Sequence, residues 1–196
     1  MKLLIKTTAS FLILILLFTG IGFAQQQSTK KLQKHITEKL TKKQKKLKKA
    51  LISRKFYADL LKDKLFVMEA DQLYTPTGQS FIVLPSLNFF AVKGNKVIFQ
   101  IGSAQGIGRN GVGGITAEGF IKNYKFNPGK NVKRPMIITG NISPRGGGAV
   151  GYFSLTVSSS GNAYLNLVLP FSGNINMSGR IVDYKNASVF KGQSLF

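Results

Sequence analysis

The spacing of apolar residues changes character near Leu65, and this change divides the chain into two kinds of structure. Before it, residues 29–64 contain no glycine or proline, and good helix formers dominate. Their apolar residues recur at steps of three, four or seven, which align them along one side of an α-helix. The pattern therefore predicts a helix over residues 29–64 with one apolar stripe, made of Leu32, Ile36, Leu40, Leu47, Leu51, Ala58, Leu61 and Leu65.

From Leu65 onward, apolar and polar positions alternate in short runs. The runs predict strands at 66–71, 80–84, 87–93, 96–101, 115–126, 132–139, 151–157, 163–169, 175–182 and 188–191, with 141–148 as a loop. Gly94-Asn95 fits a two-residue hairpin turn. About nine or ten strands with no helix between them indicate an antiparallel sandwich or barrel. Gly119 and Gly179, in the middle of strands, favour a barrel.

The stretch GIGRNGVGGITAEG (106–119) begins with a match to G-x-G-x-x-G, the pattern of a dinucleotide-binding loop. Such a loop needs a helix after the glycines, but residues 115–126 have strand composition. The acidic residue that would bind a ribose is also missing, because no Asp or Glu lies between Glu118 and Asp183. We therefore predict a flexible, structural connection between two antiparallel strands, with special backbone positions at Gly108, Asn110, Gly111, Gly113, Gly114 and Gly119.

The first residues have the pattern of a secretory signal peptide. Lys2 and Lys6 precede an apolar run, and small residues lead up to Ala24, where we predict cleavage. The competing interpretation is an uncleaved membrane anchor over residues 7–24. The chain has no cysteine, which excludes a lipoprotein anchor, a disulfide scaffold and thiol chemistry. The predicted organisation is a signal peptide (1–24), a basic helical arm (25–64) and a β domain (65–196).

The positive charge of the chain is concentrated in the helical arm. The formal net charge is +21, and residues 30–64 hold 14 of the 28 lysines and arginines. Three interpretations stay open: a solvated helix that docks or tethers the β domain, an amphipathic helix bound to an anionic membrane or envelope polymer, and non-specific contact with phosphates. Export argues against a specific nucleic-acid partner. The candidate surface contacts are Lys42, Lys43, Lys45, Lys46, Lys48 and Lys49.

Side chains for metal or acid–base chemistry are scarce. His35 is the only histidine and lies in the basic arm, so we expect no metal site, no cofactor and no Ser-His-Asp arrangement. Glu69 and Asp71 stand two apart on one predicted strand, and paired carboxylates can hydrolyse glycans. Glu118 is a third candidate. We interpret the pair as the solvent face of a strand beside lysines, and expect no catalytic residue.

Three segments together suggest a family. They are FVMEAD (66–71), RNGVGGITAEG (109–119) and ASVFKGQSL (187–195). Their combination resembles the exported bacterial family called domain of unknown function 4251, over roughly residues 56–196. The resemblance implies a secreted or envelope protein of Gram-negative bacteria with a β-barrel of the lipocalin-like type. It implies no catalytic residues.

Three functions follow from these observations. The first is a non-catalytic barrel in the periplasm or cell envelope that binds a small apolar ligand in its interior. The second is a structural or interaction protein, tethered through its basic helix to an anionic membrane or wall polymer. The third is a glycan hydrolase that uses Glu69 and Asp71. An open barrel lumen would favour the first function, whereas a lumen filled by side chains would favour the second.

Overall fold

A computed structural model describes residues 2–75, 77–103, 110–170 and 173–192, with side chains described from Leu32 onward. The chain forms two compact units that divide between Lys48 and Lys49. Helix α1 (Lys2–Asp63) begins in the first unit and ends in the second, which confirms the helix predicted over 29–64. The signal-peptide prediction concerns residues 1–24, whose side chains lie outside the described residues. Within the described part of the chain, no helix has the length and hydropathy needed to span a membrane.

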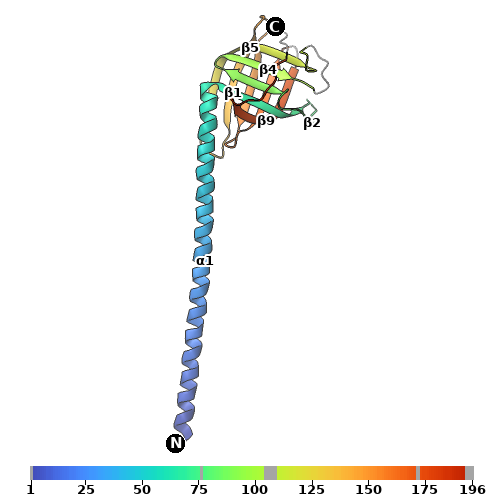
Figure 1. The fold of residues 1–196 in the computed structure, drawn as a ribbon. Coiled ribbons are helices and arrows are strands. Elements are labelled where there is room, and N and C mark those ends of the chain that lie inside the picture. Colours follow the sequence, from blue (N-terminus) through green and yellow to red (C-terminus); the bar gives the residue numbers. More distant parts are fainter. Residues whose placement is uncertain (1, 76, 104–109, 171–172, 193–196) are drawn as a thin grey trace. The chain divides into compact units, whose positions relative to one another are not determined.

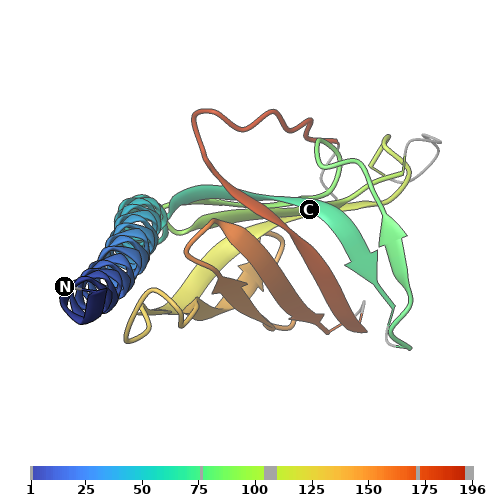
Figure 2. The same cartoon turned by 90° about the horizontal axis from the view of Figure 1, so that it is seen from below.

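The second unit contains a closed antiparallel barrel, as the alternating pattern predicted (Figures 1 and 2). The strand order is β2-β1-β3-β4-β5-β6-β7-β8-β9, and β1 also pairs with β9. Eight strands therefore close on themselves, and β2 is an extra strand beside β1. The strands are β1 (Leu65–Tyr74), β2 (Ser80–Ile82), β3 (Phe89–Lys93), β4 (Lys96–Ile101), β5 (Ile115–Asn127), β6 (Met136–Pro144), β7 (Gly151–Val157), β8 (Asn162–Leu169) and β9 (Gly173–Asp183).

Two of the strand predictions are wrong: one strand lies further along the chain than predicted, and the other does not form. The strand predicted at 132–139 is β6 and lies further along the chain, because Ile142 still pairs with β5 and β7. The first half of the predicted loop 141–148 therefore belongs to β6. The strand predicted at 188–191 does not form, because its backbone bonds elsewhere. The Phe190 N–H donates to the Ser86 carbonyl, and the Phe190 carbonyl accepts from the Gln100 side chain.

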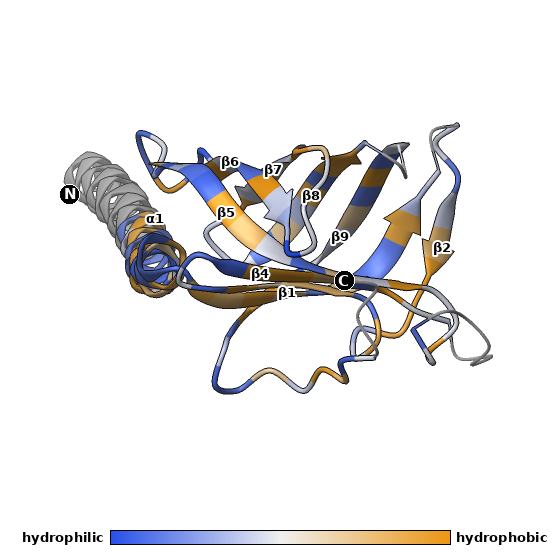
Figure 3. Cartoon of the chain, turned by 90° about the horizontal axis from the view of Figure 1, so that it is seen from above, coloured by the Kyte–Doolittle hydropathy of each residue, from blue (hydrophilic) through white to orange (hydrophobic). Residues whose placement is uncertain are grey.

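The interior of the barrel is filled by apolar side chains. The ring centres of Phe90 and Phe153 are 5.2 Å apart in this core, and both residues have no exposed surface. A side chain with no accessible surface borders no void large enough for water, so the interior leaves no room for a ligand around these residues. Figure 3 shows apolar positions alternating along the strands. The other large, fully buried core residues are Leu61, Phe66, Met68, Met136, Ile138, Leu155, Leu165, Leu167 and Met177.

The last turns of α1 belong to the barrel unit. Leu61 is fully buried in the barrel core, and its carbonyl accepts a hydrogen bond from the Tyr124 hydroxyl. Burial raises the pKa of Tyr124, which keeps this hydroxyl protonated as a donor. Two turns earlier in the helix, Arg54 donates to the Arg134 carbonyl at 2.7 Å, and Ser53 donates to the Ser159 carbonyl at 2.8 Å. The barrel unit therefore includes helical residues that precede Leu65, where the strand pattern starts.

Candidate functional site

The register of β3, β4 and β5 sorts their outward side chains into three rows on one face of the barrel. Because partners in antiparallel strands lie side by side, each row runs across all three strands. The first row is polar and aromatic, the second contains a carboxylate, and the third carries two lysines. The rows are Phe89, Gln100 and Thr116; Ala91, Ile98 and Glu118; and Lys93, Lys96 and Phe120.

The segment after β9, residues 184–192, covers the first row. Gln100 is fully buried there, yet all of its side-chain hydrogen-bonding positions are used. Its Nε2 donates to the carbonyls of Leu87 (3.0 Å) and Phe190 (2.8 Å). Its Oε1 accepts from the Thr116 hydroxyl and from the Gly192 N–H, both at 2.8 Å. A single glutamine thus ties the C-terminal segment to the barrel wall.

Asn110 organises the described end of the glycine-rich stretch. Its side chain is buried, and its Oδ1 accepts from the N–H groups of Val112 (3.1 Å) and Gly114 (2.9 Å). Its Nδ2 donates to the Thr116 hydroxyl at 3.1 Å and to the Ile101 carbonyl at 3.3 Å. The stretch is therefore linked through Thr116 to Gln100, so two of the family-like segments meet in one buried polar network.

The predicted glycine positions have backbone and steric roles in this connection between β4 and β5. Gly111 and Gly113 have φ angles of 73° and 75°, which disfavour residues with a Cβ. A Cβ on Gly114 would overlap the Ile101 carbonyl, and one on Gly119 would overlap the Ser143 carbonyl. Gly108 lies outside the described residues. The geometry gives these glycines a structural explanation that needs no nucleotide.

Glu118 forms the ion pairs at the edge of the covered row. Its carboxylate contacts Lys191 of the C-terminal segment, and it accepts from Arg145 Nη1 at 3.3 Å. The hydrogen bond from Lys191, and then the charges of Lys191 and Arg145, hold the pKa of Glu118 below its ordinary value, although partial burial opposes them. Glu118 is therefore ionised at neutral pH and unsuited to act as a general acid.

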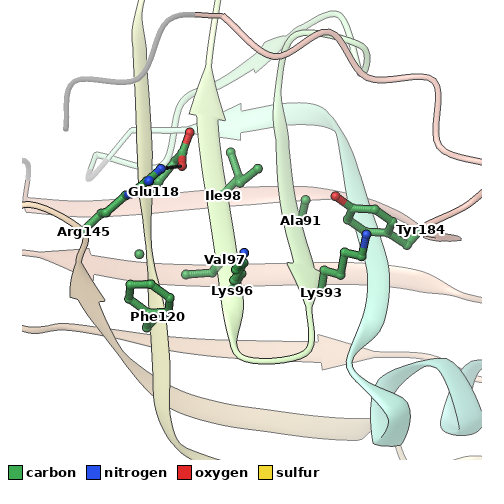
Figure 4. Close-up of a pocket in the computed structure, with 10 residues that line it drawn as sticks. Ala91, Lys93, Lys96, Val97, Ile98, Glu118, Phe120, Arg145 and Tyr184 are labelled. Atoms are coloured by element: carbon green, nitrogen blue, oxygen red, sulfur yellow. Dashed lines mark hydrogen bonds and ion pairs between the residues drawn. The ribbon is translucent and has the colours of Figure 1, made fainter.

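A pocket of about 180 Å³ lies beside Glu118, over the second and third rows (Figure 4). Lys93 and Lys96 enter it from the β3–β4 hairpin, and Phe120 enters from β5. Tyr184, from the segment after β9, closes another side, with Lys93 Nζ 5.3 Å from its ring centre. Sequence reasoning missed this pocket, because its walls come from segments far apart in the chain. The only local signal was a lysine on each side of Gly94-Asn95.

Of the three carboxylates considered for catalysis, Glu118 lies apart from the other two. Glu69 Oε1 accepts from the Ser188 N–H at 3.2 Å and so holds the C-terminal segment. Asp71 is exposed at a bulge between Ala70 and Gln72. Strands β3 and β4 separate both residues from Glu118. Among the described residues, no group of three or more His, Cys, Asp or Glu side chains could hold a metal ion.

The predicted surface contacts lie on α1. In the first unit taken by itself, the lysines are exposed, and Leu32, Ile36, Leu40 and Leu47 of the apolar stripe are also about half exposed. His35 is exposed as well. The helix therefore presents a basic surface next to an apolar one. The basic surface consists of Lys42, Lys43, Lys45, Lys46, Lys48 and Lys49.

Comparison with known proteins adds a family and a fold. A family model described as Domain of unknown function (DUF4251) matches residues 41–181. The crystal structure of a DUF4251 family protein from Bacteroides eggerthii DSM 20697 is similar, with 24% sequence identity and a TM-score of 0.57. The similarity covers 71% of this chain and 93% of that chain, and at this identity it shows the fold alone. The search of curated proteins gave no significant match.

Proposed function

This chain belongs to the DUF4251 family, whose function is unknown, and on that premise we propose that it is an exported, non-catalytic barrel protein whose basic helix binds an anionic membrane surface. The observation that carries the proposal is that the part of α1 before the barrel is both basic and apolar on its surface. Exposed lysines and exposed apolar side chains occupy the same helical segment, residues 32–48. An interfacial helix uses both, because lysines meet the lipid headgroups while apolar side chains enter the acyl boundary.

The magnitude of the attraction supports membrane binding. Each lysine near an anionic membrane surface contributes about 1 kcal/mol to the free energy of binding. The six lysines together therefore contribute more than the insertion of the apolar stripe. The apolar residues Leu40 and Leu47 favour lipid over a soluble polymer, because a polysaccharide would leave them in water. The signal peptide predicted over residues 1–24 supports the same proposal, because it would bring the protein to the cell envelope.

The barrel gives indirect support. Its interior is filled around Phe90 and Phe153, so it offers no room there for an apolar ligand. Glu69 is engaged with the backbone at Ser188, and Glu118 is held ionised by its two cations. Both facts favour a function on the exterior of the molecule over ligand storage or hydrolysis.

Co-sedimentation with lipid vesicles tests the proposal. Purified protein should sediment with phosphatidylglycerol vesicles and not with phosphatidylcholine vesicles, and salt should release it, because exposed charges are screened beyond ~8 Å at physiological ionic strength. Replacing the six helix lysines by glutamine should abolish sedimentation. Equal binding to both lipids, or binding to an anionic polysaccharide but not to vesicles, would contradict the proposal.

The matched control removes the same amount of charge elsewhere. It replaces six exposed lysines by glutamine, all of them outside residues 42–49, the basic stretch of α1. This control should still bind anionic vesicles, because the six lysines of the basic stretch are intact. If this control loses binding to the same extent, net charge alone explains the attraction. The control positions are Lys55, Lys122, Lys125, Lys130, Lys133 and Lys185.

A further inference from the structure

We propose that the pocket over the second and third rows of the barrel wall binds a small anion carried on a flat apolar ring. This site lies on the barrel and is separate from the basic stretch of α1, so the inference goes beyond membrane binding. It rests on the charge of the pocket, its apolar walls and its size.

The positive charges of the two pocket lysines are not paired with carboxylates. Lys93 and Lys96 are direct partners in the β3–β4 register, on either side of the Gly94-Asn95 turn. Like charges placed opposite each other on a sheet destabilise it. All seven acidic side chains of the chain lie in the described residues, and neither lysine forms a salt bridge with any of them. An anion between the two ammonium groups would relieve this repulsion.

Glu118 does not neutralise the pocket. Its carboxylate is already shared between Arg145 and Lys191, so the local sum of charges stays positive. The ion pair with Glu118 places the Arg145 side chain beside the second row, at the edge of the pocket (Figure 4). An anion in the pocket would thus meet two lysines that pair with no carboxylate, one of them also over the Tyr184 ring, and the arginine beside Glu118. Such cations suit phosphate or carboxylate groups.

The remaining walls are apolar and flat. Ile98 forms part of the floor, and Phe120 and Tyr184 contribute aromatic rings. Phe120 is 44% exposed, so its ring is accessible to a ligand in the pocket. The volume of about 180 Å³ suits one ring, since a cavity of roughly 150 Å³ accommodates benzene. The ligand class is therefore a single ring with one phosphate or carboxylate.

Phenyl phosphate is a suitable probe, and amide chemical shifts in a titration of the intact protein report its position. We expect saturable shifts at Lys96, Ile98 and Phe120. Benzoate distinguishes the two anion types, and binding by either anion supports the site. Inorganic phosphate and benzyl alcohol each lack one half of the proposed ligand and should bind at least roughly tenfold more weakly. No saturable shifts with either anion, or equal binding of benzyl alcohol, would overturn the proposal.

Substitutions locate the binding. Lys93→Gln combined with Lys96→Gln should weaken phenyl phosphate binding roughly tenfold or more, and Phe120→Ser should also weaken it. Both changes are at exposed positions, and circular dichroism checks that the barrel is folded. Lys130→Gln with Lys133→Gln, a charge-matched change in a surface loop, should leave affinity unchanged. Equal loss in this control would overturn the proposal.

The helix variant separates this inference from the proposed function. Protein with the six helix lysines replaced by glutamine should bind phenyl phosphate as the unmodified protein does, whether or not it binds vesicles. If the helix substitutions abolish phenyl phosphate binding while Lys93→Gln with Lys96→Gln has no effect, the anion binds α1 and the pocket proposal is wrong.

Discussion

The side-chain oxygen of Gln100 accepts a hydrogen bond from the backbone N–H of Gly192 at 2.8 Å, joining residues 92 positions apart in the chain. The relationship explains why the C-terminal segment lies on the barrel although it forms no strand. It also connects two of the family-like segments, because Thr116 bonds to the same oxygen and Asn110 bonds to Thr116. Gln100, Thr116 and Asn110 therefore form one hydrogen-bonded cluster, the clamp, which holds the C-terminal segment against the barrel wall.

Gln100→Leu should destabilise the protein by roughly 3 kcal/mol, because the buried Thr116 hydroxyl and the part-buried backbone groups of Phe190 and Gly192 lose their bonds to Gln100. Urea unfolding gives the free energy, and hydrogen exchange at Gly192 should become faster. Gln44→Leu, on the exposed surface of α1, is the control and should change the stability of the barrel little. Equal effects of the two substitutions would contradict the clamp.

Glu118→Gln should lower stability in a pH-dependent way. Because ion pairing lowers the pKa of Glu118 in the folded state, its contribution is present above the unfolded value and is lost as pH falls through the folded value. Since Arg145 and Lys191 are partly exposed, the loss at neutral pH should be at most about 1 kcal/mol.

The measurement compares unfolding free energies of the two proteins at neutral pH and at about pH 3, where the difference should shrink. Glu38→Gln, in the first unit, is the control and should show no such change. A difference that grows toward acid pH would show that the ion pairs do not stabilise the fold.

Gly114→Ala should cost roughly 3 kcal/mol, because the added Cβ would overlap the Ile101 carbonyl on a well-paired strand. Gly78→Ala is the comparison. Gly78 has a φ of 85° but no neighbour within 4 Å, so only the backbone strain of about 1 kcal/mol should appear. Thermal or urea unfolding of both variants separates close packing from strain, and equal losses would count against the packing explanation.

Export can be checked directly. Protein recovered from the cell envelope should begin near Gln25 when its N-terminus is sequenced, because cleavage is predicted after Ala24. Membrane-bound protein that still begins at Met1 would support the anchor interpretation instead.

Much of the barrel could be predicted from local pattern. Alternating positions and the Gly94-Asn95 turn identified β3 and β4, and the register Lys93 to Lys96 confirms that hairpin. The predicted boundary of β6 was wrong because the turn-like residues of the NISP segment (141–144) still pair with β5, and Asn141 and Ile142 pair with β7 as well. The C-terminal segment was predicted as a strand because Val189 and Phe190 have strand composition. Composition does not reveal that the backbone of Phe190 bonds to a loop carbonyl and to a side chain.

The candidate site was harder to predict. Its lysines flank a recognisable turn, but Arg145 and Tyr184 reach it only through the closure of the barrel and the path of the C-terminal segment. Glu118 was noted as a carboxylate, yet its partner Lys191 lies far along the chain. Long-range register of this kind leaves no trace in a single sequence.

The salt-dependent partition of two purified chains onto phosphatidylglycerol vesicles tests the central claim most directly. The chains are residues 25–196 and residues 49–196, the second retaining the helical turns that contact the barrel. Both should show the same β-sheet circular dichroism. The longer chain should bind at about 50 mM salt and dissociate at about 500 mM, while the shorter chain should stay in solution. Equal binding by the two chains, or binding of the longer chain that salt does not weaken, would contradict the role of the basic helix.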